Sequence, residues 1–251
     1  MSRKIMNEKM LRGDTLVEVM FAVGIFGIVA VSAISLMNRG VNNAQAALET
    51  TMARNEIDAQ AEALRFIHDA YAAEKHSSGK EYSGLWEYIK GKAAVAKKVP
   101  GTGETTIDDS TDFFKYPSSI SSCSEALNVS GGKVFAINTH NLGANAVKTA
   151  SSSYNNIYIV RNDSAPAGTP TIKTATTYPR LVFADRDLGA EDNDTNIKSV
   201  EGIWITAVKP ETPAASSVQY YDFYIRTCWD SPGRGTPITI STTIRLYNPD
   251  I

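Results

Sequence analysis

The stretch Arg12-Gly-Asp-Thr-Leu-Val-Glu18 and the run from Val19 to Asn38 that follows it decide how this chain is built. The run holds twenty residues without a formal charge. A helix rises about 1.5 Å per residue, so the run would span roughly 30 Å, the thickness of the hydrocarbon core of a bilayer. It therefore predicts a membrane-spanning helix.

A basic leader precedes this run. Residues 1–13 carry four cations and one anion, which are Arg3, Lys4, Lys9, Arg12 and Glu8. Positively charged residues beside a span stay on the cytoplasmic side, so the leader predicts a cytoplasmic N-terminus and an exported remainder. Glu18 is unusual for an anchor, because its carboxylate lies directly against the apolar run, five residues after Gly13.

This N-terminus resembles that of type IV pilins and of the pseudopilins of general secretion systems. In that family a prepilin peptidase cuts after a glycine and methylates the new amino terminus, and the fifth mature residue is a glutamate. Gly13 matches the cleavage glycine, Thr15-Leu-Val17 matches the small-aliphatic-aliphatic stretch, and Glu18 matches the glutamate. Asp14 stands at the first mature position, where the family most often has phenylalanine. The resemblance thus implies cleavage between Gly13 and Asp14 and leaves the efficiency of methylation open.

A conventional signal peptide is the alternative interpretation of the same residues. Val19 to Val29 would then form its apolar core, and Val31-Ser-Ala33 would be a tolerable cleavage site with small residues. Glu18 has no role in that arrangement. The long leader and the full spanning length of the run favour the prepilin interpretation.

The segment from Val41 to about Lys75 contains neither proline nor glycine and is rich in alanine, glutamate, glutamine and arginine, which predicts that the helix continues. Its apolar residues recur at steps of three and four, so one face is expected to pack against a partner or against the chain's own head. Asn38 and Gly40 are poor helix formers and predict a kink or local unwinding between the two segments. His76-Ser-Ser-Gly79 predicts the end of the helix.

A short second helix is predicted from about Gly84 to Lys98, where apolar residues share one face. Four lysines lie largely on its other side: Lys90, Lys92, Lys97 and Lys98. Such a cluster can contact phosphates, but no aromatic residue interleaves with the lysines after Tyr88, and a solvated helix face is commoner. The net charge of -2 adds no global attraction to nucleic acid, so nucleic-acid binding is not predicted.

Residues 99–131 are rich in glycine, serine, threonine and aspartate and predict mainly loop. Beyond them the hydrophobic period changes to two, which predicts strands separated by turns. The last candidate strand alternates aliphatic residues with hydroxyl or basic residues, as a half-buried antiparallel strand does, and Ser231-Pro-Gly-Arg-Gly235 suits a hairpin loop before it. The candidate strands are Lys133 to Asn138, Ile157 to Arg161, Arg180 to Ala184, Gly202 to Val208, Val218 to Trp229 and Ile238 to Tyr247.

The two cysteines, Cys123 and Cys228, both follow the membrane segment. Export would carry them to an oxidising compartment, where one disulfide between them is the economical expectation.

The sequence carries no recognisable motif for catalysis or metal binding. The sequence has no Walker loop, no dinucleotide-binding glycine pattern and no nucleophile elbow. The three histidines, His68, His76 and His140, lack metal-ligand spacing. The acidic stretch from Asp185 to Asp194 offers oxygen ligands for calcium but lacks the order of an EF-hand loop, which favours a solvated turn. The sequence therefore predicts no enzyme, no cofactor and no metal site.

These features predict an α+β protein in four parts: the leader 1–13, a transmembrane or filament-core helix 14–38, its continuation 39–76 and a β-rich head domain 77–251. The resemblance implies a pilin-like fold, in which the lower part of the helix packs against neighbouring subunits and an antiparallel sheet covers the upper part.

The function implied by the resemblance is that of a structural, minor pilin-like subunit of a type IV pilus or related filament. The large head and the atypical Asp14 favour a minor subunit over the bulk one. The implied partners are prepilin peptidase, other pilin subunits and the inner-membrane assembly platform. The chain would cross the cytoplasmic membrane once, N-terminus inside, and reach the cell surface in the filament. A secretion pseudopilin and a membrane-anchored binding ectodomain that never polymerises are the alternatives.

Overall fold

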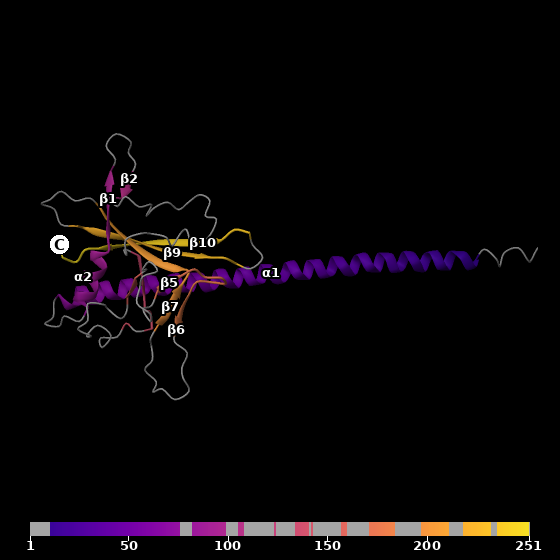
Figure 1. Ribbon diagram of the computed structural model, residues 1–251, viewed down its shortest axis with the longest axis horizontal. Helices are drawn as coiled ribbons and strands as arrows, with labels where there is room; N and C mark the ends of the chain where they lie inside the picture. Colours follow the sequence, from indigo (N-terminus) through magenta and orange to yellow (C-terminus); the bar gives the residue numbers. More distant parts are fainter. Residues whose placement is uncertain are drawn as a thin grey trace, which may run out of the picture. The chain divides into compact units, whose positions relative to one another are not determined.

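A computed structural model describes residues 11–75, 82–98, 105–107, 123, 134–140, 142, 157–159, 171–183, 197–210, 218–231 and 235–250. The chain divides into two compact units, Met1–Leu48 and Glu49–Ile251. Helix α1 (Leu11–Glu74) is one helix of 64 residues that contributes to both units (Figure 1). The second unit is a head domain of α+β type.

The predicted unwinding around Asn38 and Gly40 is absent, because α1 continues without interruption through both residues. A glycine inside a helix costs only about 1 kcal/mol relative to alanine, and helix propagation on both sides is cooperative. The predicted continuation of the helix beyond Val41 is confirmed, since α1 ends at Glu74.

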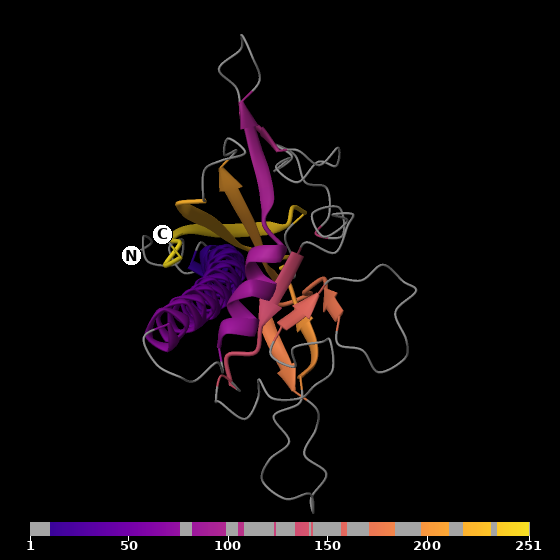
Figure 2. The same ribbon diagram turned by 90° about the vertical axis from the view of Figure 1, so that its left-hand side faces the viewer.

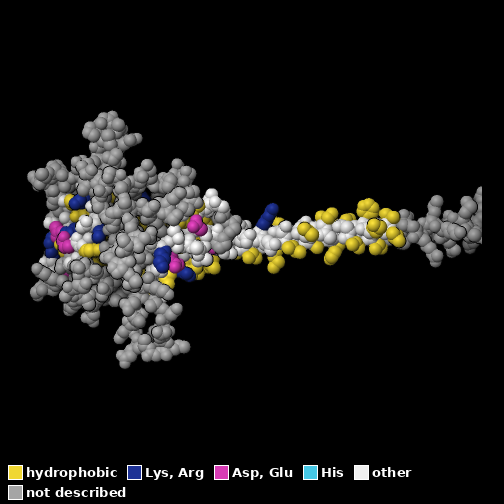
Figure 3. All heavy atoms as spheres, viewed as in Figure 1, with side chains coloured by type: hydrophobic (Ala, Val, Ile, Leu, Met, Phe, Trp, Pro, Cys, Tyr) yellow, Lys and Arg dark blue, Asp and Glu magenta, His cyan; other side chains and the backbone are white. Residues whose placement is uncertain are grey.

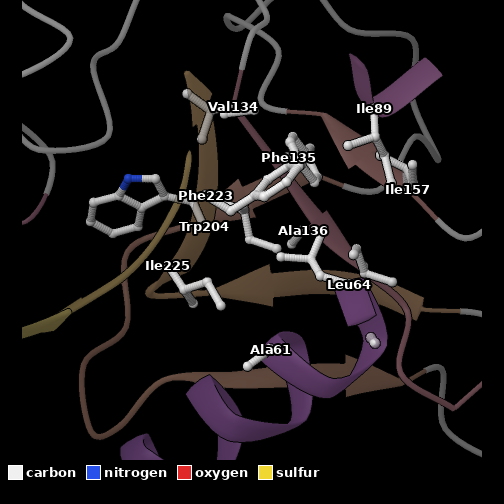
Figure 4. Close-up of a cluster of buried hydrophobic side chains, with 14 of the residues drawn as sticks. Ala61, Leu64, Ile89, Val134, Phe135, Ala136, Ile157, Trp204, Phe223 and Ile225 are labelled. Carbon is white, nitrogen blue, oxygen red and sulfur yellow. The ribbon is translucent and has the colours of Figure 1, made fainter. Parts of the chain in front are cut away.

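Within the head domain, α1 buries one face against the sheets. The buried positions follow steps of three and four residues, as the sequence predicts. Figure 4 shows Ala61 and Leu64 of α1 on the side of the helix that faces Phe135 and Ile225. Each large side chain buried in this way stabilises the fold by about 1.5 to 3 kcal/mol. The apolar residues of α1 in this core are Ala53, Ile57, Ala61, Ala63, Leu64, Ile67 and Tyr71.

The larger sheet has the strand order β10-β9-β8-β1-β2, with β3 paired to β8 and β4 paired to β3. It is mainly antiparallel, as predicted, but β1 is parallel to β8. Its strands are β1 (Ala94–Lys98), β2 (Thr105–Ile107), β3 (Val134–Ile137), β4 (Ile157–Ile159), β8 (Ile203–Pro210), β9 (Tyr220–Trp229) and β10 (Ile238–Tyr247).

A smaller sheet has the order β5-β7-β6, in which β7 is parallel to β5 and antiparallel to β6. Its strands are β5 (Thr171–Lys173), β6 (Arg180–Phe183) and β7 (Ile197–Glu201). All six predicted strands have counterparts, namely β3, β4, β6, β8, β9 and β10.

The predicted second helix is shorter than expected. Helix α2 (Ser83–Gly91) lies against α1, as Figures 1 and 2 both show and as the edge-to-face contact of Trp86 with His68 requires. The chain then enters β1, which pairs with β8 from Ala94 to Ala96. Pairing with a strand more than a hundred residues away overrides the helical propensity of this alanine- and lysine-rich segment. The prediction of helix up to Lys98 is therefore wrong.

The β9–β10 hairpin agrees with the predicted alternation. Ten consecutive pairs join the two strands, from Ile238 with Trp229 to Tyr247 with Tyr220. In β10, Ile244 is buried whereas Ser241 is exposed. Side chains of one parity thus face the core and those of the other face outward.

A sharp junction joins the two sheets at Gly202. Strand β7 of the smaller sheet leads directly into β8 of the larger one, and Gly202 between them has a φ of 65°. Its N–H donates to the carbonyl of Lys173 over 2.7 Å, and its own carbonyl accepts from the N–H of Cys228 over 2.9 Å. Cys228 forms the predicted disulfide with Cys123, with their Cα atoms 5.5 Å apart. Sheet junction and disulfide therefore meet at one place.

Glu56 is an acidic residue in the partly buried surface of α1. Its Oε1 atom is buried and has no hydrogen-bond partner. Burial raises the pKa of Glu56 to about 7, and the Gln60 side chain offsets only part of this rise. The unfolded chain, with a pKa near 4.5, loses the proton first, so the free energy of unfolding falls as the pH rises from about 4.5 through 7.

Glu56→Gln is expected to remove this pH dependence. At about pH 8 the variant should be more stable than the wild type by about 2 to 3 kcal/mol, and near pH 4 the two should be nearly equal. Urea unfolding of the detergent-solubilised chain measures the difference through fluorescence, since all three tryptophans are buried in the head domain. Glu62→Gln, on the exposed side of α1, is the matched control. An equal gain at both pH values would mean that the buried charge is not the cause.

Candidate functional site

The N-terminal half of α1 is a helix covered with exposed apolar side chains. Every large apolar side chain from Leu16 to Met37 is more than half exposed, from 52% at Val17 to 73% at Phe26. Figure 3 shows these side chains on both visible margins of the helix. A helix that is hydrophobic all round is stable only when lipid or other protein surrounds it. This segment, 16–37, is the candidate site.

The segment meets the length and composition that a membrane span requires. Only Glu18 and Arg39 carry a charge between Leu16 and Leu48, and they stand on either side of the twenty-residue uncharged run. A membrane anchor and a signal sequence both pass this test. The structure thus identifies one apolar helix able to enter a membrane.

The predicted processing positions lie at the start of the same helix. Gly13 and Asp14 fall in the first turn of α1, which begins at Leu11, and their side chains lie outside the described part. Glu18 is four residues after Asp14, so the two positions share one helix face. The Glu18 side chain is exposed and forms no hydrogen bond or ion pair with the described residues. The positions predicted for processing and the position predicted for assembly therefore lie at the same end of one helix.

In the head domain, polar side chains of α1 hold specific backbone and side-chain groups. The buried Glu49 carboxylate accepts hydrogen bonds from Trp229 Nε1 at 3.2 Å and from Ser231 Oγ at 2.6 Å. The Gln60 amide donates to the carbonyl of Ile137 and accepts from its N–H, at 2.7 and 2.9 Å. Sequence reasoning missed both contacts, because an isolated Glu or Gln in a polar helical segment carries no signal of its partner.

A cluster of charges joins the end of the chain to both helices. Asp250 accepts hydrogen bonds from Tyr71 of α1 at 2.5 Å and from Lys90 of α2 at 2.7 Å, and it pairs with Lys75. Burial acts to raise the pKa of Asp250, but these hydrogen bonds outweigh it and lower the pKa to about 2. The cluster fastens the C-terminal segment to the helices and is a structural feature.

The lysines considered for nucleic-acid binding belong to two different elements. Lys90 is engaged by Asp250, and Lys92 lies over the Tyr88 ring, 4.9 Å from its centre. Lys97 and Lys98 belong to β1, and their side chains lie outside the described part. Because α2 ends at Gly91, the four lysines do not share a helix face.

The structure describes two of the three histidines and does not describe the acidic stretch considered for calcium. Within the described ranges, no group of three potential metal ligands is found. His68 contacts the carbonyl oxygen of Tyr247 at 2.8 Å, and His140 stacks near Phe183. His76 and the acidic stretch 185–194 lie outside the described residues.

Comparison with protein-family models, with curated proteins and with solved structures found no match to this chain. The assignment of a function therefore rests on the sequence and on the geometry above.

Proposed function

We propose that this chain is a minor pilin-like subunit of a type IV pilus or related filament. Prepilin peptidase would cut it between Gly13 and Asp14, and it would assemble through the N-terminal half of α1. One observation carries the proposal: the helix that exposes the apolar segment 16–37 is the same helix whose residues 49–71 form part of the head core. One helix thus contributes both the apolar surface and part of the head core.

The apolar segment would have two successive environments. Before assembly it would cross the cytoplasmic membrane with the basic leader inside and the head outside. In the filament, the same side chains would pack against α1 of other subunits, delivered by the inner-membrane assembly platform. Both environments remove the apolar surface from water, so transfer between them costs little hydrophobic free energy.

Glu18 would supply specificity to this transfer. A charged residue near the centre of a bilayer costs about 2.5 to 3.5 kcal/mol on insertion scales, so a carboxylate drawn into an apolar filament core needs a cationic partner. The amino terminus freed at Asp14 of a neighbouring subunit provides one. The carboxylate of Asp14 competes for the same amine, which suits a specialised position with few neighbours.

Glu18→Ala is expected to be inserted and cleaved normally but to enter filaments several-fold less often than the wild type. Filaments sheared from cells that produce both forms at matched membrane levels, probed with form-specific tags, measure the ratio. Glu62→Ala is the matched control, because Glu62 is an exposed glutamate on the head half of the same helix. Equal incorporation of Glu18→Ala would refute the charge pairing. Absence of the wild-type chain from sheared filaments would refute the filament function and favour an anchored ectodomain.

A further inference from the structure

The proposed cut between Gly13 and Asp14 reverses the charge at the cytoplasmic end of the apolar helix. In the uncut chain, residues 1–18 hold four cations and three anions, so together with the amino group of Met1 this end has a net charge of +2. After the cut, the new amino group and the carboxylates of Asp14 and Glu18 are the charges that remain there, a net charge of -1. Methylation of the amino group keeps its positive charge. Processing thus changes the sign of this end.

Asp14 is the residue that makes the mature end negative. It stands four residues before Glu18 in α1, and no lysine or arginine occurs between the two or in the uncharged run 19–38. Carboxylates at this spacing on a helix repel each other, so neither charge is offset by the other. With an uncharged first residue, the amino group and Glu18 alone would give a net charge of zero. The unbalanced charge of the mature end therefore comes from Asp14.

The position of Arg39 shows which charges have to cross the membrane. α1 runs without interruption from Asp14 through Arg39, so the uncharged run 19–38 separates Glu18 from Arg39 by roughly 30 Å along the helix axis. This length equals the thickness of the hydrocarbon core of a bilayer. In the proposed membrane orientation, Glu18 lies at the cytoplasmic boundary while Arg39 already lies at the outer one. Only the end with Asp14 and Glu18 would cross when the helix leaves the membrane for a filament.

The membrane potential acts on that end during the transfer. The cytoplasmic side of an energised membrane is negative, and a potential of 100 mV changes the equilibrium for moving one elementary charge across it by about fiftyfold. For the mature end, with its charge of -1, the potential favours outward transfer. For the uncut end, with its charge of +2, the same potential opposes outward transfer, by about fiftyfold for each charge.

Building on the proposed filament function, we propose that the membrane potential draws the mature end of α1 outward during assembly and that Asp14 determines the direction of this force. The leader would hold the uncut chain in the membrane, because its cations oppose the transfer. The cut would remove these cations and leave a negative end that the potential expels. This role accounts for an acidic residue at a first mature position where the pilin family most often has phenylalanine.

Competition between Asp14 and Glu18 for a neighbouring amino group is a separate effect. It would take place in the filament, where no membrane potential acts. Removal of the Asp14 carboxylate would relieve this competition to the same degree at any potential. A dependence of incorporation on the membrane potential therefore distinguishes the two roles of Asp14.

The test compares the wild type with Asp14→Asn in cells that produce both full chains with different tags. Existing filaments are sheared off, and new ones form either at the normal membrane potential or after a potassium ionophore and external potassium have collapsed it. The measurement is the ratio of wild type to variant in the new filaments, divided by their ratio as mature chains in the membrane. This normalised ratio should be at least about threefold higher at the normal potential, because the variant carries one negative charge less across the membrane.

Two further variants serve as controls. Asp14→Glu keeps the negative charge and should respond to the potential as the wild type does. Asp58→Asn removes an exposed carboxylate from the head half of α1, which does not cross the membrane, and its normalised ratio should be the same at both potentials. N-terminal mass measurement establishes that each variant is cut after Gly13, and Asp14→Ala replaces Asp14→Asn if the latter is cut incompletely.

An equal normalised ratio at both potentials would overturn the proposal, and a ratio that rises when the potential collapses would contradict it as well. In both cases the presence of the wild type in filaments would leave the proposed filament function intact. A wild type that is absent from filaments at the normal potential would instead refute that function, and with it the basis of this inference.

Discussion

Gly202→Ala is expected to lower the free energy of unfolding of the head domain by about 3 kcal/mol or more. A Cβ atom at this position would lie 2.6 Å from the Cβ of Ala175 and 2.6 Å from the carbonyl oxygen of Cys228. The backbone there has a φ of 65°, which side chains other than glycine rarely adopt. Steric overlap and backbone strain therefore add at one residue.

The loss would be a large share of a typical stability of about 5 to 15 kcal/mol. Urea unfolding of the detergent-solubilised chain, followed by tryptophan fluorescence, measures it. Gly235→Ala is the matched control, because a Cβ there meets no atom within 4 Å and the residue is exposed. A loss below about 1 kcal/mol would mean that the two sheets do not meet at Gly202 as described.

Loss of the Cys123–Cys228 disulfide is expected to destabilise the head domain by about 3 to 4 kcal/mol. The two cysteines are 105 residues apart, and both are fully buried. Closing a loop of this size restricts the unfolded chain strongly, with an upper value of about 4.7 kcal/mol in the chain-entropy model. The double variant Cys123→Ala/Cys228→Ala should therefore unfold at lower urea concentration.

Reduced wild-type protein provides the control, since it should lose nearly as much stability as the double variant. Thiol labelling of denatured, unreduced protein checks the bond itself. Modification of both cysteines in that experiment would show that the disulfide is absent in the exported chain.

The elements that sequence reasoning predicted well are those specified by local patterns. Strand β10 has the predicted bounds, Ile238 to Tyr247, because its alternation depends only on neighbouring residues. Helix α1 likewise follows from composition and three- and four-residue steps. The prediction of unwinding at Gly40 was wrong, because the strong helix formers around this residue outweigh its low helix propensity.

The elements that were missed depend on partners far along the chain. Strand β1 has the residues of a helix and becomes a strand by pairing with β8, more than a hundred residues away, and with β2. Strand β7 is only five residues long, and no turn signal separates it from the next strand in the sequence. Gly202 was predicted to begin a strand, whereas in the structure it separates β7 from β8. The role of Gln60 could not be predicted either, because its hydrogen-bond partner, Ile137, is 77 residues away in the sequence.

Sequence predicted the apolar helix of the candidate site, with Glu18 at its start, and the disulfide cysteines of the head domain. The place of β10 at one end of the larger sheet could not be predicted, because only the strand order shows it.

The mature N-terminus tests the central claim most directly. The chain extracted from membranes of cells that contain prepilin peptidase is subjected to intact and N-terminal mass measurement. The proposed function predicts a first residue of Asp14, with the leader removed, and predicts that a bulky replacement of Gly13 leaves the leader attached. A chain that begins at Met1 would support a plain membrane anchor, and one that begins between Ser32 and Ile34 would support a signal peptide. Either result would contradict assignment as a filament subunit.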